Sequence, residues 1–230
     1  MAQGSHKPAM TTEEPDDIQE RSFKVLVVGE YGVGKTSIIR RFTEGTFHAN
    51  YRLTIGVDFA SKTLKWDDST KINLQLWDIA GHERFGSMTR VYYKHAVGAL
   101  LVYDLTRPAT FEASVKWLND INAKVVLPNG EPIPVILLAN KCELLADKVN
   151  EATVREFCKK HEIKEWFITS AKDNINIDKS IEKLVSEMMD LEESALSREF
   201  MMNSVEIPAY EEHPMEVSTE QDKRRCCVIL

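Results

Sequence analysis

The chain has 230 residues, of which 43% are hydrophobic and 28% charged, and its formal net charge is −7. This length suits one large domain with tails, because it can bury a sizeable core. The acidic balance disfavours nucleic-acid binding, since a phosphate backbone requires a basic face, so we expect no nucleic acid partner. The longest apolar runs fall short of the ~20 residues of a membrane helix. Residues 1–17 lack the apolar core of a secretory signal, so we expect a cytosolic body.

Strand-like apolar runs alternate with helical patterns or long connections along the chain. They cover residues 23–28, 57–66, 71–77, 99–104, 134–139 and 166–169. The alternation predicts a doubly wound α/β fold with a mostly parallel six-stranded sheet. The polar turn 67–70 joins two of these runs as a hairpin, which makes one edge strand antiparallel. A final helix is predicted by an apolar stripe with helical spacing, formed by Ile177, Ile181, Leu184, Val185, Met188 and Leu191.

Both ends of the chain lack a usable hydrophobic period. The N-terminal stretch mixes Thr, Glu, Pro and Asp, and the C-terminal stretch carries prolines and many acids. We therefore expect a disordered N-terminal tail over 1–21, one globular domain over 22–194, and a flexible, disordered tail over 195–230.

A glycine-rich loop between the first predicted strand and a helix-like segment carries the strongest functional signal. It consists of Gly29, Glu30, Tyr31, Gly32, Val33, Gly34, Lys35 and Thr36, followed by Ser37. The glycines let successive backbone N–H groups turn inward, and the helix N-terminus adds positive potential. Lys35 can reach the outer phosphates, and the Thr36 hydroxyl suits a magnesium ligand. The pattern indicates a site for a nucleoside triphosphate with Mg²⁺, with a plain glycine-rich turn as the alternative.

Four residues further along are suited to the same ligand. Thr54 lies in a polar loop that can close over magnesium and the last phosphate, and Phe47 in the same loop can stack on a base. Asp78 ends a predicted strand, where it can hold magnesium through water. Gly81 can offer its backbone N–H to the terminal phosphate. These residues predict a ligand that bridges two loops.

Two polar clusters that follow the later strands predict the base. Asn140, Lys141 and Glu143 follow one buried strand, and Ser170, Ala171 and Lys172 follow the last. A carboxylate there can accept hydrogen bonds from the ring N–H and the amino group of guanine. Adenine would leave that acceptor unpaired, so the pattern favours guanine.

Taken together, these motifs resemble the Ras superfamily of small GTPases, and the Rab proteins in particular. Three segments, 54–59, 77–85 and 92–99, are similar to the Rab signatures around the two switch regions. Ile79 and the segment 127–134 are similar to the branch that serves lysosome-related organelles of the melanosome and gut-granule type. The resemblance runs from 23 to 191 in order and spacing.

The resemblance implies a P-loop small GTPase fold with a hypervariable C-terminal tail. It implies that Thr36 and Thr54 ligate Mg²⁺ and that Asp78 supports the metal, while Gly81 senses the γ-phosphate and acts with His82 in catalysis. It also implies a GTP or GDP site formed by Gly29, Glu30, Tyr31, Gly32, Val33, Gly34, Lys35, Thr36, Ser37, Phe47, Tyr51, Thr54, Asp78, Gly81, Asn140, Lys141, Glu143, Ser170, Ala171 and Lys172. Effectors would read Ile55, Phe59, Trp77, Phe85 and Tyr92.

The family also implies partners and a location. The implied partners are a guanine-nucleotide exchange factor, a GTPase-activating protein, a prenylation escort or GDP-dissociation inhibitor, and trafficking effectors. We expect a monomer on the cytoplasmic face of lysosome-related or endolysosomal membranes, with a cytosolic pool.

Departures from the family pattern bear on hydrolysis and on guanine recognition. His82 stands where most members have the glutamine that orients water, and Tyr31 stands where Ras itself has glycine, so we expect slow turnover. His82 positioning water, or an activating protein supplying a glutamine, is an equal alternative. Glu143 replaces the usual aspartate and adds one methylene, so we expect the preference for guanine to survive with a lower affinity.

The last residues predict a lipid anchor. Cys227 begins a C-terminal prenylation pattern ending in Leu230, and Cys226 can take a second lipid. A second lipid or the basic residues 223–225 would add the second signal that stable anchoring requires. An incidental Cys-Cys end is the alternative.

Three functions follow from these observations. The first is a membrane-anchored GTP/GDP switch that recruits trafficking effectors. The second is a nucleotide-gated adaptor that hardly hydrolyses GTP and stays in the GTP state, which His82 and Tyr31 favour. A metabolic kinase is a distant third, since no acceptor-substrate domain is evident.

Overall fold

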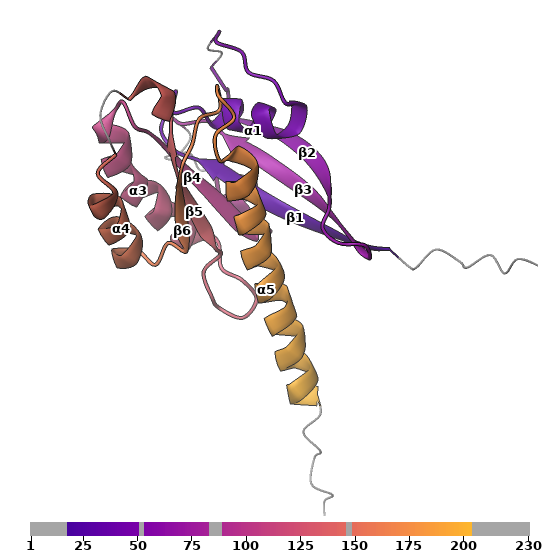
Figure 1. Cartoon of the computed structure of the whole chain (residues 1–230). Helices are drawn as coiled ribbons and strands as arrows, with labels where there is room; N and C mark the ends of the chain where they lie inside the picture. Colours follow the sequence, from indigo (N-terminus) through magenta and orange to yellow (C-terminus); the bar gives the residue numbers. More distant parts are fainter. Residues whose placement is uncertain (1–17, 51–52, 83–88, 146–148, 204–230) are drawn as a thin grey trace, which may run out of the picture.

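The computed structural model describes residues 18–50, 53–82, 89–145 and 149–203. Within these ranges, six strands form one sheet in the order β2-β3-β1-β4-β5-β6 (Figure 1). The strands are β1 (Gln19–Val28), β2 (Val57–Lys65), β3 (Thr70–Ile79), β4 (Gly98–Asp104), β5 (Val135–Asn140) and β6 (Glu165–Ile168). The helices are α1 (Lys35–Glu44), α2 (Thr89–Tyr93), α3 (Pro108–Lys124), α4 (Glu151–Lys160), α5 (Ile177–Asn203) and a 3-10 turn, η2 (Cys142–Leu144).

The pairing confirms the predicted mixed sheet. β1 runs parallel to β3 and to β4, and β4, β5 and β6 continue in parallel. β2 pairs antiparallel with β3, from Val57 opposite Ile79 to Lys65 opposite Lys71, as the predicted hairpin requires. Because parallel strands end at the same edge of a sheet, the loops after β1, β4, β5 and β6 meet there.

Regular structure enters both segments that the sequence analysis assigns to tails. β1 begins at Gln19, whose backbone N–H donates to the Ser69 carbonyl at 2.8 Å. The side chains of Gln19 and Glu20 are exposed, so main-chain pairing forms this end of the strand without an apolar period. α5 continues to Asn203 because each further residue adds one backbone hydrogen bond to a helix that is already nucleated.

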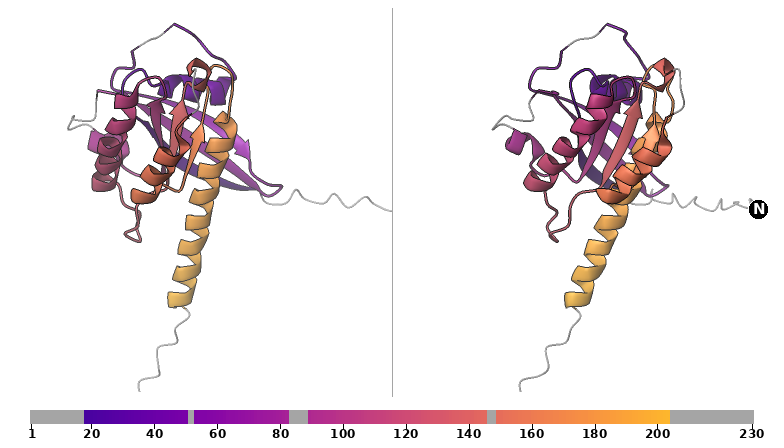
Figure 2. Two further views of the ribbon diagram at one scale, coloured as in Figure 1. Left: turned by 60° about the vertical axis from the view of Figure 1, so that its left-hand side comes forward. Right: turned by 90° about the vertical axis from the view of Figure 1, so that its left-hand side faces the viewer.

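Hydrophobic cores lie on the two faces of the sheet. Val25 and Val27 of β1 belong to one core, and the alternate residues Leu26 and Val28 belong to the other. Helices α1 and α5 cover the first face, and α2, α3 and α4 cover the second (Figure 2). β4 and β5 are buried along their whole length, as parallel strands covered on both faces must be.

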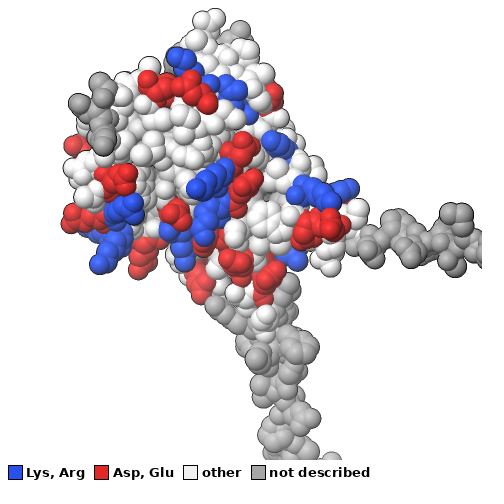
Figure 3. All heavy atoms as spheres, viewed as in Figure 1, with Lys and Arg blue, Asp and Glu red and all other residues white. Residues whose placement is uncertain are grey.

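The surface carries charges of both signs. On the face seen in Figure 3, lysine and arginine side chains lie interspersed with aspartate and glutamate. In the part of the chain that the structure describes, no helix has the length and apolar character needed to cross a membrane.

Candidate functional site

A cavity of about 360 Å³ opens at the edge of the sheet where the parallel strands end. Its walls come from the loop between β1 and α1, from residues 46–50, 53 and 54, and from the loops after β3, β5 and β6. The predicted site residues in these walls are Tyr31, Gly32, Gly34, Lys35, Thr36, Ser37, Phe47, Thr54, Gly81, Asn140, Lys141, Glu143, Ala171 and Lys172. The cavity therefore brings together loops that are far apart in the sequence.

Other predicted residues lie behind these walls. Gly29, Glu30 and Val33 belong to the same glycine-rich loop, with Val33 fully buried. Ser170 is also fully buried, and its hydroxyl accepts from the backbone N–H of Asp173 at 2.9 Å, which shapes the loop after β6. Tyr51, Phe85, Cys226 and Cys227 lie outside the described residues.

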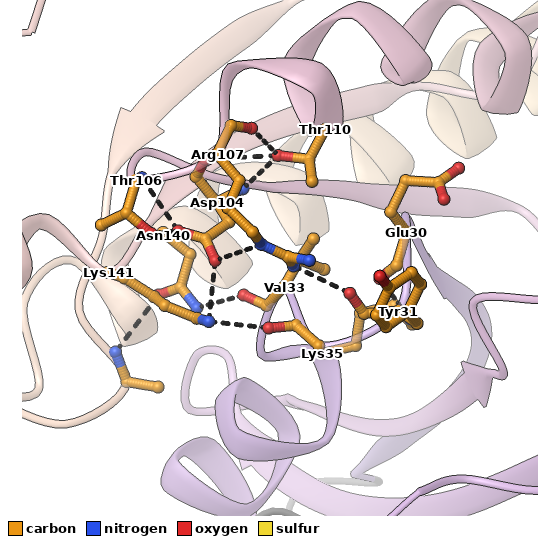
Figure 4. Close-up of polar contacts among 12 residues, drawn as sticks. Glu30, Tyr31, Val33, Lys35, Asp104, Thr106, Arg107, Thr110, Asn140 and Lys141 are labelled. Atoms are coloured by element: carbon orange, nitrogen blue, oxygen red, sulfur yellow. Dashed lines mark hydrogen bonds and ion pairs between the residues drawn. The ribbon is translucent and has the colours of Figure 1, made fainter.

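The carbonyl groups of the glycine-rich loop are held by side chains (Figure 4). Lys35 Nζ donates to the carbonyls of Gly29 and Glu30 at 2.8 and 3.0 Å. Lys141 Nζ donates to Gly32 at 2.7 Å, and Asn140 Nδ2 donates to Val33 at 2.8 Å. In a trans peptide the N–H points opposite to the C=O, so a carbonyl held on one side of the loop turns the next N–H group to the other side. Such a nest of N–H groups suits a polyphosphate.

Two glycines allow the loops to approach one another closely. Gly34 has φ 104°, and a Cβ there would lie 2.3 Å from Asn140 Nδ2. A Cβ on Gly81 would lie 2.2 Å from the backbone nitrogen of Tyr31. Both positions therefore require glycine, and Gly81 lies directly against the phosphate loop.

Three oxygen-bearing side chains converge at the start of α1. The hydroxyl of Thr36 donates to Asp78 Oδ2 and lies 3.0 Å from the hydroxyl of Thr54. Thr54 also donates to Asp78 Oδ2 at 3.3 Å. Burial raises the pKa of the Asp78 carboxyl against the lowering effect of these hydrogen bonds and of Lys35. The three side chains that were predicted for magnesium are thus neighbours.

This cluster fits a magnesium ion by its chemistry. Asp78 is only 2% exposed, and its Oδ1 atom has no hydrogen-bond partner among the described residues. A buried acceptor without a donor is costly, and a hard cation with water would satisfy it. In the described ranges no group of three or more His, Cys, Asp or Glu is placed to hold a metal ion, and this site instead combines one carboxylate with two hydroxyl groups.

The cavity walls also hold the groups expected for a base. Asn140 Oδ1 accepts from the Ala171 N–H and from the Thr169 hydroxyl, each at 3.3 Å, and so joins the loops after β5 and β6. Glu143 lines the cavity from η2, and its buried Oε2 atom has no partner among the described residues. Phe47 also lines the cavity. A carboxylate acceptor and an aromatic ring in the walls of one cavity suit the recognition of guanine.

The predicted effector residues form an exposed apolar region. Ile55 and Phe59 are 82% and 71% exposed, and the Phe59 ring centroid lies 6.2 Å from that of half-buried Trp77. Half-buried Tyr92 lies close by, since its hydroxyl is 3.9 Å from a Cβ built on Gly56. This region lies beside Thr54, so the loop that closes the cavity continues into an exposed surface.

The proposed water-orienting residue lies outside the cavity walls. His82 is exposed in the turn after β3, directly after Gly81. The neighbouring backbone is fixed, because the Ala80 N–H donates to the Gly56 carbonyl at 3.0 Å. The two loops that carry Thr54 and Gly81 are therefore joined by a main-chain hydrogen bond.

Sequence reasoning missed a group of polar residues behind the glycine-rich loop. Asp104 at the end of β4 binds Lys141 and Arg107, and Arg107 donates to the Tyr31 carbonyl at 2.8 Å. Trp117 of α3, which is fully buried, also donates to Glu30 Oε1 at 3.1 Å. One signal was available: Asp104 is a carboxylate at the carboxyl end of a buried parallel strand, where ligand sites gather.

Comparison with known proteins identifies the family. The Ras family profile matches residues 24–190. The chain therefore belongs to the Ras family of small GTPases. Membership of this family implies a bound guanine nucleotide and GTP hydrolysis.

Similar curated proteins confirm the resemblance to the Rab proteins. Ras-related protein Rab-32 of Mus musculus is 50% identical over 220 residues, which cover 95% of this chain and 96% of that protein. Rab-32A of Dictyostelium discoideum is 51% identical over 188 residues, covering 80% and 84% of the two chains. Rab-7L1 of Homo sapiens is 46% identical over 171 residues, covering 74% and 84%.

The lysine of the phosphate loop predicts a pH dependence. Burial lowers the pKa of Lys35 to about 8, despite the opposing attraction of Asp78 and Glu30. A bound polyphosphate favours the charged ammonium, so binding takes up a proton wherever the free lysine is neutral. We expect constant GDP affinity below about pH 7, and a fall of up to tenfold per pH unit above about pH 8. Affinity that stays constant to about pH 9 would contradict this protonation linkage.

Proposed function

We propose that this protein is a Rab-type switch of vesicle trafficking that binds GTP and GDP with Mg²⁺ and hydrolyses GTP slowly. The observation that supports it best is the position of Thr54. Its hydroxyl lies 3.0 Å from that of Thr36 in the phosphate site, while its neighbour Ile55 is 82% exposed. Thr54 and its neighbour Ile55 thus connect the nucleotide site with the proposed effector surface.

The switch follows from these contacts. When bound, Mg²⁺ supplies positive charge beside the outer phosphates at Thr36, Thr54 and Asp78. Thr54 and Gly81 contact the ligand from two loops that the Ala80–Gly56 hydrogen bond joins. Loss of the last phosphate removes a shared partner from both loops, which then release the surface around Ile55. An effector that binds only the ordered surface therefore binds the GTP state and not the GDP state.

Slow hydrolysis is the part of the proposal that depends on His82. A glutamine amide donates and accepts from one end, whereas neutral imidazole has its donor and acceptor on different ring edges. Orienting water between a catalytic group and phosphate is therefore harder for His82. In this account the protein spends longer in its GTP state than a member with glutamine.

Replacing His82 by glutamine tests the slow-turnover proposal. We expect the single-turnover rate of GTP hydrolysis to rise by about tenfold or more, because the amide restores a water-orienting geometry. The matched control is His161→Gln at the end of α4, where the imidazole packs on Phe157 and does not line the cavity. Equal rates for His82→Gln and the wild type would show that His82 already positions water.

The alternative adaptor function is distinguished from the switch by measuring GTP hydrolysis with and without an activating protein of the family. A switch should show strongly accelerated turnover, because such a protein can supply a missing catalytic group in trans. A permanent adaptor should retain its GTP in both conditions. His82 and the 60% exposed Tyr31 are the residues that favour the adaptor.

Attachment to a membrane completes the proposed function. We place the protein on the cytoplasmic face of lysosome-related or endolysosomal membranes, through prenylation at Cys227 and a second signal from Cys226 or residues 223–225. Its partners would be an exchange factor, an activating protein, a prenylation escort or GDP-dissociation inhibitor, and effectors. Mass spectrometry of the native C-terminal peptide tests the anchor, and an unmodified Leu230 would contradict it.

A further inference from the structure

All of the first five carbonyl groups of the phosphate loop, from Gly29 to Val33, are held by side chains. Four of these carbonyls bind Lys35, Lys141 or Asn140, which belong to the nucleotide-binding motifs. The remaining carbonyl, that of Tyr31, accepts from a terminal nitrogen of Arg107 at 2.8 Å. Arg107 belongs to none of these motifs and directly precedes α3.

The Tyr31 carbonyl controls the direction of one N–H group in the cavity wall. The peptide between Tyr31 and Gly32 is planar, so an outward carbonyl turns the Gly32 N–H toward the cavity. Gly32 has φ 67°, and glycine tolerates rotation of its neighbouring peptide at little steric cost. The backbone alone therefore does not fix this peptide, and the contact from Arg107 is what orients it.

Asp104 holds Arg107 in place. Its carboxylate is buried, with the residue 1% exposed. Oδ2 accepts from Arg107 Nε at 2.9 Å and from Lys141 Nζ at 2.8 Å. Oδ1 accepts from the backbone N–H and the hydroxyl of Thr106 at 2.9 and 2.7 Å. One fully satisfied carboxylate therefore orients both cations that hold the carbonyls of Tyr31 and Gly32, as Figure 4 shows.

The guanidinium geometry is suited to this role. Arg107 uses Nε for Asp104 and a terminal nitrogen for Tyr31, so a single rigid fork spans the two acceptors. Its guanidinium carbon also lies 5.4 Å from the centre of the Tyr31 ring. Trp117 of α3 adds a second connection through its hydrogen bond to Glu30. Helix α3 and its first flanking residue thus hold two consecutive residues of the phosphate loop.

We propose that Asp104 and Arg107 are positioning residues for the nucleotide, which set its residence time by holding the Tyr31–Gly32 peptide with its N–H toward the polyphosphate. This inference rests on the proposed binding of guanine nucleotides. According to it, two residues outside the nucleotide-binding motifs help to retain GDP and GTP. Neither residue needs to touch the ligand.

The test is the release of fluorescent GDP from Arg107→Lys in the full chain with Mg²⁺. Lysine keeps the charge near Asp104 but lacks the fork, so we expect the Tyr31 contact to be lost and release to be about tenfold faster. The matched control is Arg155→Lys, because Arg155 also binds a carboxylate and lies over an aromatic ring, in α4. This control should release GDP at the wild-type rate.

A phosphorus NMR spectrum of bound GDP separates positioning from general destabilisation. We expect Arg107→Lys to shift a phosphate resonance, whereas Arg155→Lys leaves the spectrum unchanged. The inference is overturned if Arg107→Lys releases GDP at the wild-type rate. It is also overturned if this variant releases GDP faster but leaves the phosphorus spectrum unchanged. If the wild type itself retains no GDP, the proposed function fails together with this inference. If the wild type retains GDP and Arg107→Lys releases it at the same rate, only this inference fails and the proposed function stands.

Discussion

Replacing Asn140 by alanine is expected to speed GDP release about a hundredfold or more. The side chain, 1% exposed, holds the Val33 carbonyl on one side and the Ala171 N–H on the other. Its removal leaves these buried groups unpaired, at a cost of about 3 kcal/mol, which corresponds to about two orders of magnitude in an equilibrium constant. Both the phosphate loop and the loop under the base lose their shared support.

The Asn140 prediction is measured by the dissociation rate of fluorescent GDP. Asn140→Asp is the informative partner variant, because it keeps an acceptor for Ala171 but replaces the donor to Val33 with a second, negatively charged oxygen. The control is Asn129→Ala, which removes an exposed turn contact to the Glu131 N–H. Release from Asn140→Ala within about twofold of the control would show that the two loops are held independently of this side chain.

Replacing Glu143 by alanine should weaken GDP binding by about ten- to a hundredfold and leave ADP binding unchanged. Its buried Oε2 atom has no partner among the described residues, and the charged hydrogen bonds that guanine would donate are worth about 1.5–3 kcal/mol. Adenine offers no matching donors, so its binding does not depend on this carboxylate. The variant is therefore expected to lose its discrimination between the two bases.

Equilibrium titration with GDP and ADP measures this discrimination. Glu151→Ala is the matched control, since that glutamate is exposed in α4 and pairs only with Arg155 among the contacts described. Glu143→Asp tests the extra methylene and should bind GDP at least as tightly as the wild type. If Glu143→Ala and the wild type show the same GDP affinity, another group must recognise the base.

The sequence predicted the sheet well where burial is continuous. β4 and β5 are buried throughout and apolar up to their last residues, Asp104 and Asn140, and their predicted ends lie within one residue of the observed ones. The polar start of β1 and the last turns of α5 were not predicted, because main-chain pairing and helix propagation form them without an apolar period. Periodicity reports burial, whereas Gln19, Glu20 and residues 192–195 are exposed.

The candidate site could be predicted where each residue follows a strand in a recognisable motif. Asn140 and Glu143 are examples, because the loop after a parallel strand reaches the ligand edge of the sheet. The contact between Arg107 and Tyr31 joins residues 76 positions apart and depends on the tertiary arrangement of α3. No local pattern indicates such a contact.

Isothermal titration calorimetry of the nucleotide-free chain with Mg²⁺ tests the central claim most directly, which is that this cavity binds a guanine nucleotide. The account predicts saturable heat at one site for GDP and for GTP, and no comparable heat for ADP. Absence of heat from both guanine nucleotides, or equal binding of ADP, would contradict it.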